Sequence, residues 1–295
     1  MQDKYWESSC DAISLSSRQV LNEYLLSLKL ENKAVATIIK YRWFLEKFLK
    51  DCPPSLEDIS SEFIRKWLDV FSIDKKPRTI DLVLATLSSF FTFCLNEEYI
   101  ENAVMKKRWR PQIPKSLPKY LDDVEYVRVK RVSEYLPLRD RAIILFLLSS
   151  GCRVSELSNL NIEDIHFESR TAEVTGKGKK IRHIHFSQKC AFVLNDYLRT
   201  RLSKVTDPLF MNKFGNPLLT GGIRKVVRKA GIEAEFNQSF HPHCCRHTFA
   251  TRMLARGADL QFIADEMGHS DLNTTRGYAR IPTEDMILKY HNIMG

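Results

Sequence analysis

Apolar residues recur at helical spacing throughout the first third of the chain. Side chains three or four positions apart lie on one face of an α-helix, so each such run predicts an amphipathic helix that packs into a core. The apolar positions of four such runs are Val20, Leu21, Tyr24, Leu25 and Leu28; Ile38, Ile39, Tyr41, Phe44, Leu45, Phe48 and Leu49; Phe63, Ile64, Trp67, Leu68 and Phe71; and Ile80, Val83, Leu84, Leu87, Phe90 and Phe91. The pattern therefore predicts a helical first domain, and we interpret most of its aromatic residues as helix core.

The helical pattern stops in the segment RWRPQIPKSLPKYL, which spans residues 108–121. Its three prolines and four basic residues follow no helical period, which is typical of an extended linker. Directly after it, Asp122 and Glu125 have the spacing of a capping box that opens a new helix. We therefore expect a first domain over residues 1–107, a linker over 108–120 and a second domain over 121–295.

The second domain contains one stretch that alternates at period two, over residues 165–187, with Gly176 and Gly178 interrupting it. Alternation of apolar and polar residues indicates strands, so this stretch predicts a small antiparallel sheet. Helical patterns return near residue 189, over 222–230, and in two further segments that Gly257 and Gly268 would cap. The predicted fold class is mainly α with a small antiparallel β-sheet.

Composition narrows the class of protein. The formal net charge is +9 over 295 residues, and most of the excess follows residue 117, which favours a polyanionic partner, nucleic acid first. The N-terminal residues show no signal-peptide pattern, and the longest apolar run, residues 142–148, is too short to span a bilayer. The seven cysteines follow no pairing pattern, as expected for free thiols in a reducing compartment. We therefore expect a cytoplasmic protein that does not contact a membrane.

The segment HPHCCRHTFA, residues 241–250, raises the question of a metal site. Structural zinc sites pair their ligands at spacings that let four side chains converge, whereas Cys244 and Cys245 are adjacent and point in different directions. His243 and His247 have the spacing of a helical zinc pair, but no glutamate stands between them as in metalloproteases. We therefore favour the alternative that His243 and Arg246, three positions apart on one helical face, bind an anion, and we expect no metal or other cofactor.

Four segments concentrate side chains that can bind and transfer a phosphate. They contain Arg153 with Glu156, Lys177 in the turn TGKGKK, His243 with Arg246, and His269 with Tyr278. Each has an ordinary structural explanation by itself: a helix ion pair, a solvated turn lysine, a polar cap or a half-buried core residue. Together they provide arginines for non-bridging oxygens, a tyrosine nucleophile and proton donors, without the carboxylate cluster that a two-metal nuclease needs.

These six residues, in this order, resemble the active-site set of the tyrosine recombinases, the site-specific DNA recombinases of the Xer and phage-integrase types. They are Arg153, Lys177, His243, Arg246, His269 and Tyr278. The GKG turn, the HxxRHTFAT box and the MGHSDLNTTRGYAR ending also match, and the resemblance covers essentially the whole chain. It departs at Cys244-Cys245, where an apolar pair is commoner, and at residues 101–104, ENAV, which replace the usual Asn-Pro.

The resemblance implies that residues 1–107 form a SAM-like core-binding domain and that residues 121–295 form the catalytic domain. Tyr278 would attack the scissile phosphate to form a 3′-phosphotyrosine, with Lys177 protonating the leaving oxygen. His243 would act as acid or base, and His269 would donate to the phosphate. The implied partners are double-stranded DNA with inverted-repeat sites and a homotetramer on two sites, or a related recombinase. The residues after Tyr278 would form a protomer-exchange tail.

Three alternatives remain at this point. A type IB topoisomerase shares the chemistry, a DNA-binding regulator explains the charge and the helices, and a zinc protein explains only residues 241–250. Chromosome-dimer resolution, transposon cointegrate resolution and element integration are all open as biological roles, as are the target site and its spacer.

Overall fold

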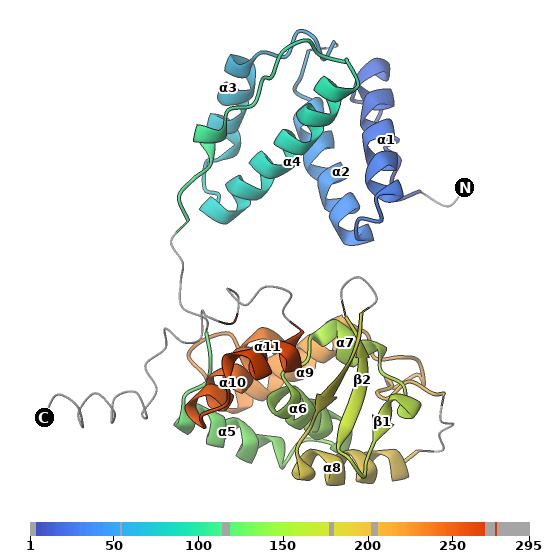
Figure 1. The fold of residues 1–295 in the computed structure, drawn as a ribbon, viewed down its shortest axis with the longest axis vertical. Helices are drawn as coiled ribbons and strands as arrows, with labels where there is room; N and C mark the ends of the chain where they lie inside the picture. The colour runs from blue at the N-terminus through green and yellow to red at the C-terminus, as the bar shows by residue number, and fades with distance from the viewer. Residues whose placement is uncertain are drawn as a thin grey trace, which may run out of the picture. The chain divides into compact units, whose positions relative to one another are not determined.

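The computed structural model of this chain describes residues 4–53, 55–113, 119–176, 180–201, 206–268 and 275. The chain divides into two compact units, Met1–Lys115 and Ser116–Gly295 (Figure 1). The six-residue set proposed above falls entirely in the second unit. Lys177, His269 and Tyr278 lie outside the described residues, as does the predicted tail.

Unit 1 is helical. Its helices are α1 (Leu15–Leu30), α2 (Val35–Leu49), α3 (Ser61–Phe71), α4 (Pro77–Asn96) and the 3-10 turn η1 (Lys107–Trp109). Ser14 and Ser60 cap α1 and α3 by accepting backbone N–H groups, and Pro77 opens α4 at a position where no N–H is needed. The apolar positions predicted from the sequence form one core, except that Ile39 is 44% exposed. Trp109 packs against this core, so the start of the predicted linker is folded onto unit 1.

Helix α4 is long and apolar enough, by length and composition alone, to cross a membrane. Its apolar residues, however, have partners within unit 1. Val83, Leu87 and Phe90 are fully buried, and α4 contacts both α1 and α2. We therefore interpret α4 as the central core helix of unit 1.

Unit 2 combines helices with one small sheet. Its elements are α5 (Asp123–Ser133), α6 (Leu138–Ser150), α7 (Val154–Asn159), the 3-10 turn η2 (Ile162–Asp164), β1 (Ile165–His166), β2 (Thr171–Thr175), β3 (Ile181–His185), α8 (Gln188–Arg199), α9 (Thr220–Glu233), α10 (Pro242–Ala255) and α11 (Leu260–Met267). The strands are antiparallel in the order β1-β2-β3, and Glu173 pairs with His183 in the middle of the β2–β3 register. The predicted fold class, mainly α with a small antiparallel sheet, is confirmed.

Helix α6 organises unit 2. Its residues 142–148 are all buried, and it contacts α5, α8, α9, α10 and β3, so the apolar run in the sequence is a core helix. Gly151 ends α6 in the left-handed conformation, with φ of 61°. A Cβ atom at this position would lie 2.3 Å from a ring carbon of Phe249, so both the backbone and the close packing require glycine. This turn places Arg153 at the start of α7.

Candidate active site

The guanidinium of Arg246 lies between the C-terminal ends of two helices. It projects from α10 and is 5% exposed. Its Nη1 donates to the carbonyl of Gly151 at the end of α6 (2.7 Å), and its Nη2 donates to the carbonyl of Met267 at the end of α11 (2.5 Å). Each helix C-terminus carries about half a negative charge, so these two ends help to compensate a buried cation. The side chain is thereby fixed in one orientation.

Arg153 lies beside Arg246 through the same turn of α11. Its Nη2 donates to the carbonyl of Gly268 at 3.0 Å, and Gly268 directly follows the residue whose carbonyl holds Arg246. Glu156 holds Arg153 from one turn further along α7, accepting from the backbone N–H at 2.7 Å and from Nη1 at 2.8 Å. The pairing of Arg153 with Glu156 expected from the sequence is therefore present. Neighbouring carbonyls bring two of the predicted arginines to one place.

Glu156 is 2% exposed and ionised. Burial by itself raises the pKa of this carboxyl, but hydrogen bonds from Arg182 and from Arg153 outweigh burial and hold the pKa below its ordinary value. Arg182 donates to both carboxylate oxygens at 2.9 Å. Sequence reasoning did not single out Arg182, because an arginine within the alternating pattern of a strand gives no signal of its own.

The histidines of α10 lie at and near the surface. His243 is exposed, and loss of solvent around the ring, together with the positive charges of His241 and Arg246, lowers its pKa. Burial and the same kind of neighbours lower the pKa of His247 to about 4. Both rings are therefore neutral at neutral pH. A neutral imidazole at position 243 can accept a proton, as the predicted acid/base partner must.

The two cysteines of this segment pack as apolar residues. Cys244 and Cys245 are buried in the core of unit 2, and burial raises the pKa of both thiols. Zinc binds thiolates, which this environment disfavours. Across the described ranges, no three histidine, cysteine or acidic side chains are grouped closely enough to hold a metal ion.

The described residues frame the three that lie outside them. Strand β2 ends at Thr175, strand β3 begins at Ile181, and Gly176 donates to the carbonyl of Lys180 at 2.8 Å. Lys177 itself lies outside the described residues. Helix α11 ends at Gly268 with φ of 60°, as the sequence predicted, and His269 is the next residue. The positions of Lys177, His269 and Tyr278 relative to the arginines stay predictions.

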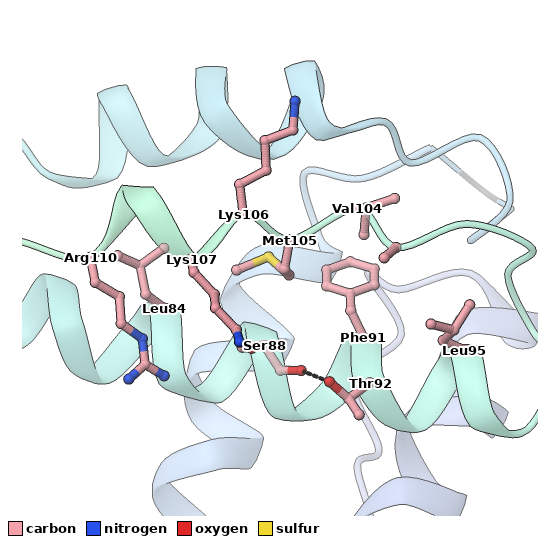
Figure 2. A pocket seen from close by; sticks show the side chains of 11 residues that line it. Leu84, Ser88, Phe91, Thr92, Leu95, Val104, Met105, Lys106, Lys107 and Arg110 are labelled. Carbon is pink, nitrogen blue, oxygen red and sulfur yellow. Dashed lines mark hydrogen bonds between the residues drawn. The ribbon is translucent and has the colours of Figure 1, made fainter.

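Unit 1 carries a separate basic groove beside α4, with a volume of about 420 Å³. Leu84, Phe91 and other apolar side chains line it, and the segment that follows α4 returns along it. Figure 2 shows Lys107 and Arg110 extending to the same side over α4, while Lys106 points away from them. The groove therefore presents two cations above an otherwise largely apolar lining.

Comparison with known protein families assigns both units. The model of the phage integrase family matches residues 119–284, and the model of the phage integrase N-terminal SAM-like domain matches residues 21–98. Tyrosine recombinase XerA of Pyrococcus horikoshii is 36% identical over 273 residues, which cover 90% of each chain. Tyrosine recombinase XerC of Halalkalibacterium halodurans is 31% identical over 293 residues, covering 93% of this chain and 96% of that protein.

Solved structures show the same fold. The XerH site-specific recombinase, in a post-cleavage complex with a palindromic difH substrate, matches with a TM-score of 0.76 at 22% identity, covering 98% of this chain and 94% of that one. A lambda integrase dimer bound to a COC′ core site matches with a TM-score of 0.73 at 20% identity, covering 88% of this chain and 94% of that one. The chain therefore belongs to the phage integrase family, and it is a site-specific recombinase of the tyrosine type.

Proposed function

We propose that this recombinase exchanges strands between two short DNA sites through a covalent link at Tyr278. The observation that carries the proposal is that two guanidinium groups, from Arg153 and Arg246, both contact the last turn of α11. Arg246 and Arg153 donate to the adjacent carbonyls of Met267 and Gly268, immediately before the segment that contains His269 and Tyr278. Two forked cations at one place suit the charge that develops on the non-bridging oxygens of a phosphate under attack.

The proposed reaction balances without metal or ATP. The hydroxyl oxygen of Tyr278 attacks the scissile phosphorus, and its proton passes to His243, whose lowered pKa keeps the ring neutral and able to accept it. The phosphorus–5′-oxygen bond breaks, and Lys177 protonates the leaving oxygen. His269 donates a hydrogen bond to the phosphate. The phosphoester energy stays in the 3′-phosphotyrosine, so a 5′-hydroxyl of the partner duplex can reverse the step.

We propose that unit 1 binds the DNA backbone as a core-binding domain, while residues 121–295 form the catalytic domain with its tail. Lys107 and Arg110 extend over the same groove, and together they can contact phosphate oxygens. The net charge of +9 supports a duplex partner. We further propose that the DNA target carries inverted-repeat sites. We also propose that the protein is cytoplasmic, with access to the chromosome.

We also propose a homotetramer on two sites, in which the tail of one protomer docks on the next; a related recombinase could occupy some positions. A cavity of about 410 Å³ in unit 2 combines apolar side chains with Lys130, Arg252 and Arg256. Burial, together with the positive charges of Lys189 and Arg252, lowers the pKa of Lys130. The tail offers the complementary acidic pair Glu284-Asp285, followed by Met286, Ile287 and Leu288.

A charge reversal tests this docking. Arg256→Glu should abolish tetramers on DNA in sedimentation while leaving binding to a single site intact. Glu284→Arg in the same chain should restore part of the assembly, because the reversed charges again attract each other. Tetramers of unchanged stability in Arg256→Glu would contradict docking in this cavity.

The central experiment is a covalent trap. The protein first selects its site from a library of random-sequence duplexes, and a nicked duplex built on that site is then incubated with it in EDTA. A covalent adduct should form with the wild type and be absent with Tyr278→Phe. A DNA-binding regulator would give no adduct, and strict dependence on added Mg²⁺ would contradict the mechanism. A type IB topoisomerase would relax supercoiled DNA without exchanging strands between two copies of the site.

The roles of two cations can be separated with a 5′-bridging sulfur in the substrate, which leaves without needing a proton. Lys177→Ala should then cleave nearly as fast as the wild type, because the variant lacks only the donor that protonates the leaving oxygen, and a leaving sulfur does not need that proton. Arg246→Lys should stay slow by about 100-fold or more, because one ammonium cannot replace a fork of donors. If sulfur rescued neither variant, Lys177 would not be the proton donor.

A further inference from the structure

One guanidinium connects three elements around the candidate active site. Arg182 projects from β3 and donates through Nη1 and Nη2 to the two carboxylate oxygens of Glu156 on α7. Its Nε donates at 3.2 Å to the carbonyl of Glu266, next to the carbonyls that hold the two arginines of the site. A Cβ atom at Gly268 would lie 2.7 Å from Cζ of Arg182, so the backbone there rests against the guanidinium. Arg182 thus links the sheet, the start of α7 and the end of α11.

Stability alone is a weak explanation for this arrangement. The side chains of Arg182 and Glu156 are 16% and 2% exposed, so both charges lose most of their solvent. For buried ion pairs the loss of solvation offsets much of the attraction, and apolar residues of similar volume often serve as well. What an ion pair adds is direction. The forked pairing fixes the plane of the carboxylate, and the same carboxylate fixes Arg153.

We propose that Arg182 is a positioning residue for strand cleavage, which acts through Glu156 and the end of α11 to fix the direction of Arg153. This inference rests on the proposed function. Arg182 is itself largely buried, and among the described residues it acts through the groups that it holds. An error of about 1 Å in the position of a group that stabilises the transition state can slow a reaction about 100-fold. Cleavage should therefore depend on Arg182 even where DNA binding does not.

A pH dependence distinguishes positioning from direct action on the phosphate. Among the influences that lower the pKa of Glu156, the hydrogen bonds from Arg182 are the largest, and they oppose burial. Without Arg182, burial shifts the pKa upwards, and a protonated Glu156 no longer attracts Arg153 as an anion. Raising the pH then restores the ionised carboxylate. Cleavage by an Arg182 variant should accordingly recover as pH rises, whereas a residue that itself bound the phosphate would, when removed, slow cleavage equally at every pH.

The test uses the full chain and the nicked duplex described above. Arg182→Met keeps an unbranched apolar stem but removes the charge and the donors, and Arg182→Lys keeps the charge but removes the fork. Arg170→Ala removes an exposed arginine from the β1–β2 turn as the control. Single-turnover rates of adduct formation are measured from pH 6 to 9, together with the Kd for the unnicked site.

We expect Arg182→Met to form the adduct 10–100-fold more slowly at pH 7, to recover part of the loss by pH 9, and to bind DNA within about 3-fold of the wild type. Adduct formation by Arg182→Lys should be slower than that of the wild type, with a similar pH profile. This variant tests the positioning role if Arg182→Met does not fold. In Glu156→Gln, adding Arg182→Met should slow cleavage little further, since both changes remove one linkage.

Three results would overturn the inference: wild-type rates in Arg182→Lys, a loss in Arg182→Met that is constant with pH, or fully multiplicative losses in the double variant. A weaker Kd that accounts for the whole loss would also overturn it. If the wild type itself formed no adduct, the proposed function would fail first, and the inference would fail with it.

Discussion

Replacing Glu156 with glutamine should destabilise unit 2 by about 3–5 kcal/mol. The carboxylate accepts four hydrogen bonds, two from Arg153 and two from Arg182, and its side chain is 2% exposed. Glutamine keeps the volume but is neutral, and its amide group faces guanidinium donors. Removing one partner from a buried ion pair leaves uncompensated charge, and such changes have this magnitude. A domain in the middle of the usual stability range of about 5–15 kcal/mol would remain folded.

Urea unfolding can measure this change separately in the two units. The four tryptophans, Trp6, Trp43, Trp67 and Trp109, all lie in unit 1, so their fluorescence follows that unit, while circular dichroism at 222 nm follows both. Glu156→Gln should shift the unfolding transition of unit 2, which circular dichroism reports, and leave the fluorescence transition of unit 1 unchanged. Glu163→Gln, which neutralises an exposed carboxylate in the same unit, should change stability by less than about 0.5 kcal/mol.

The pH dependence provides a second check on the same prediction. The pKa of Glu156 in the folded state is below its ordinary value. The ionised carboxylate therefore stabilises the fold at a pH above the ordinary carboxyl pKa, and this stabilisation is lost as the pH falls through the pKa of the folded state. Glu156→Gln should therefore show a weaker loss of stability in acid than the wild type. A shift in the unit 2 transition no larger than that of Glu163→Gln would refute the assigned network.

Three further outcomes follow from the structure. Gly151→Ala should destabilise unit 2 by about 2–4 kcal/mol in urea, because it adds left-handed backbone strain to a clash with an aromatic ring of α10; an effect below 1 kcal/mol would count against the described turn. The pKa of His247 is lowered to about 4 by burial, so stability should fall as pH drops from 6.5 to 4, by at most about 3 kcal/mol, and His247→Asn should flatten that change in thermal melts. Replacing Lys107 and Arg110 with alanine should reduce the slope of log Kd against log salt by about 0.9 for each phosphate that these two cations neutralise, and an unchanged slope would remove the groove from the DNA interface.

Local features of this protein could be predicted because they depend on neighbours along the chain. Helical and alternating periodicity identified a mainly α fold with one small sheet, since each pattern fixes which side chains share a face. The pairing of Arg153 with Glu156 was also predictable, because residues three apart on a helix lie together. Ile39 shows the limit of periodicity: it lies beside the apolar face of α2, and packing leaves it 44% exposed.

The sequence by itself determined the family and a set of six candidate residues, since the order and spacing of motifs are visible without a fold. Only the tertiary structure decided how the described members of that set are held. Arg246 meets a carbonyl 95 positions earlier in the chain, and Arg182 meets Glu156 across 26 positions. Such pairings leave no periodic trace, because they depend on how whole helices pack against one another. Every residue has a backbone carbonyl, so only packing selects the carbonyls of Gly151, Glu266, Met267 and Gly268 to anchor these arginines.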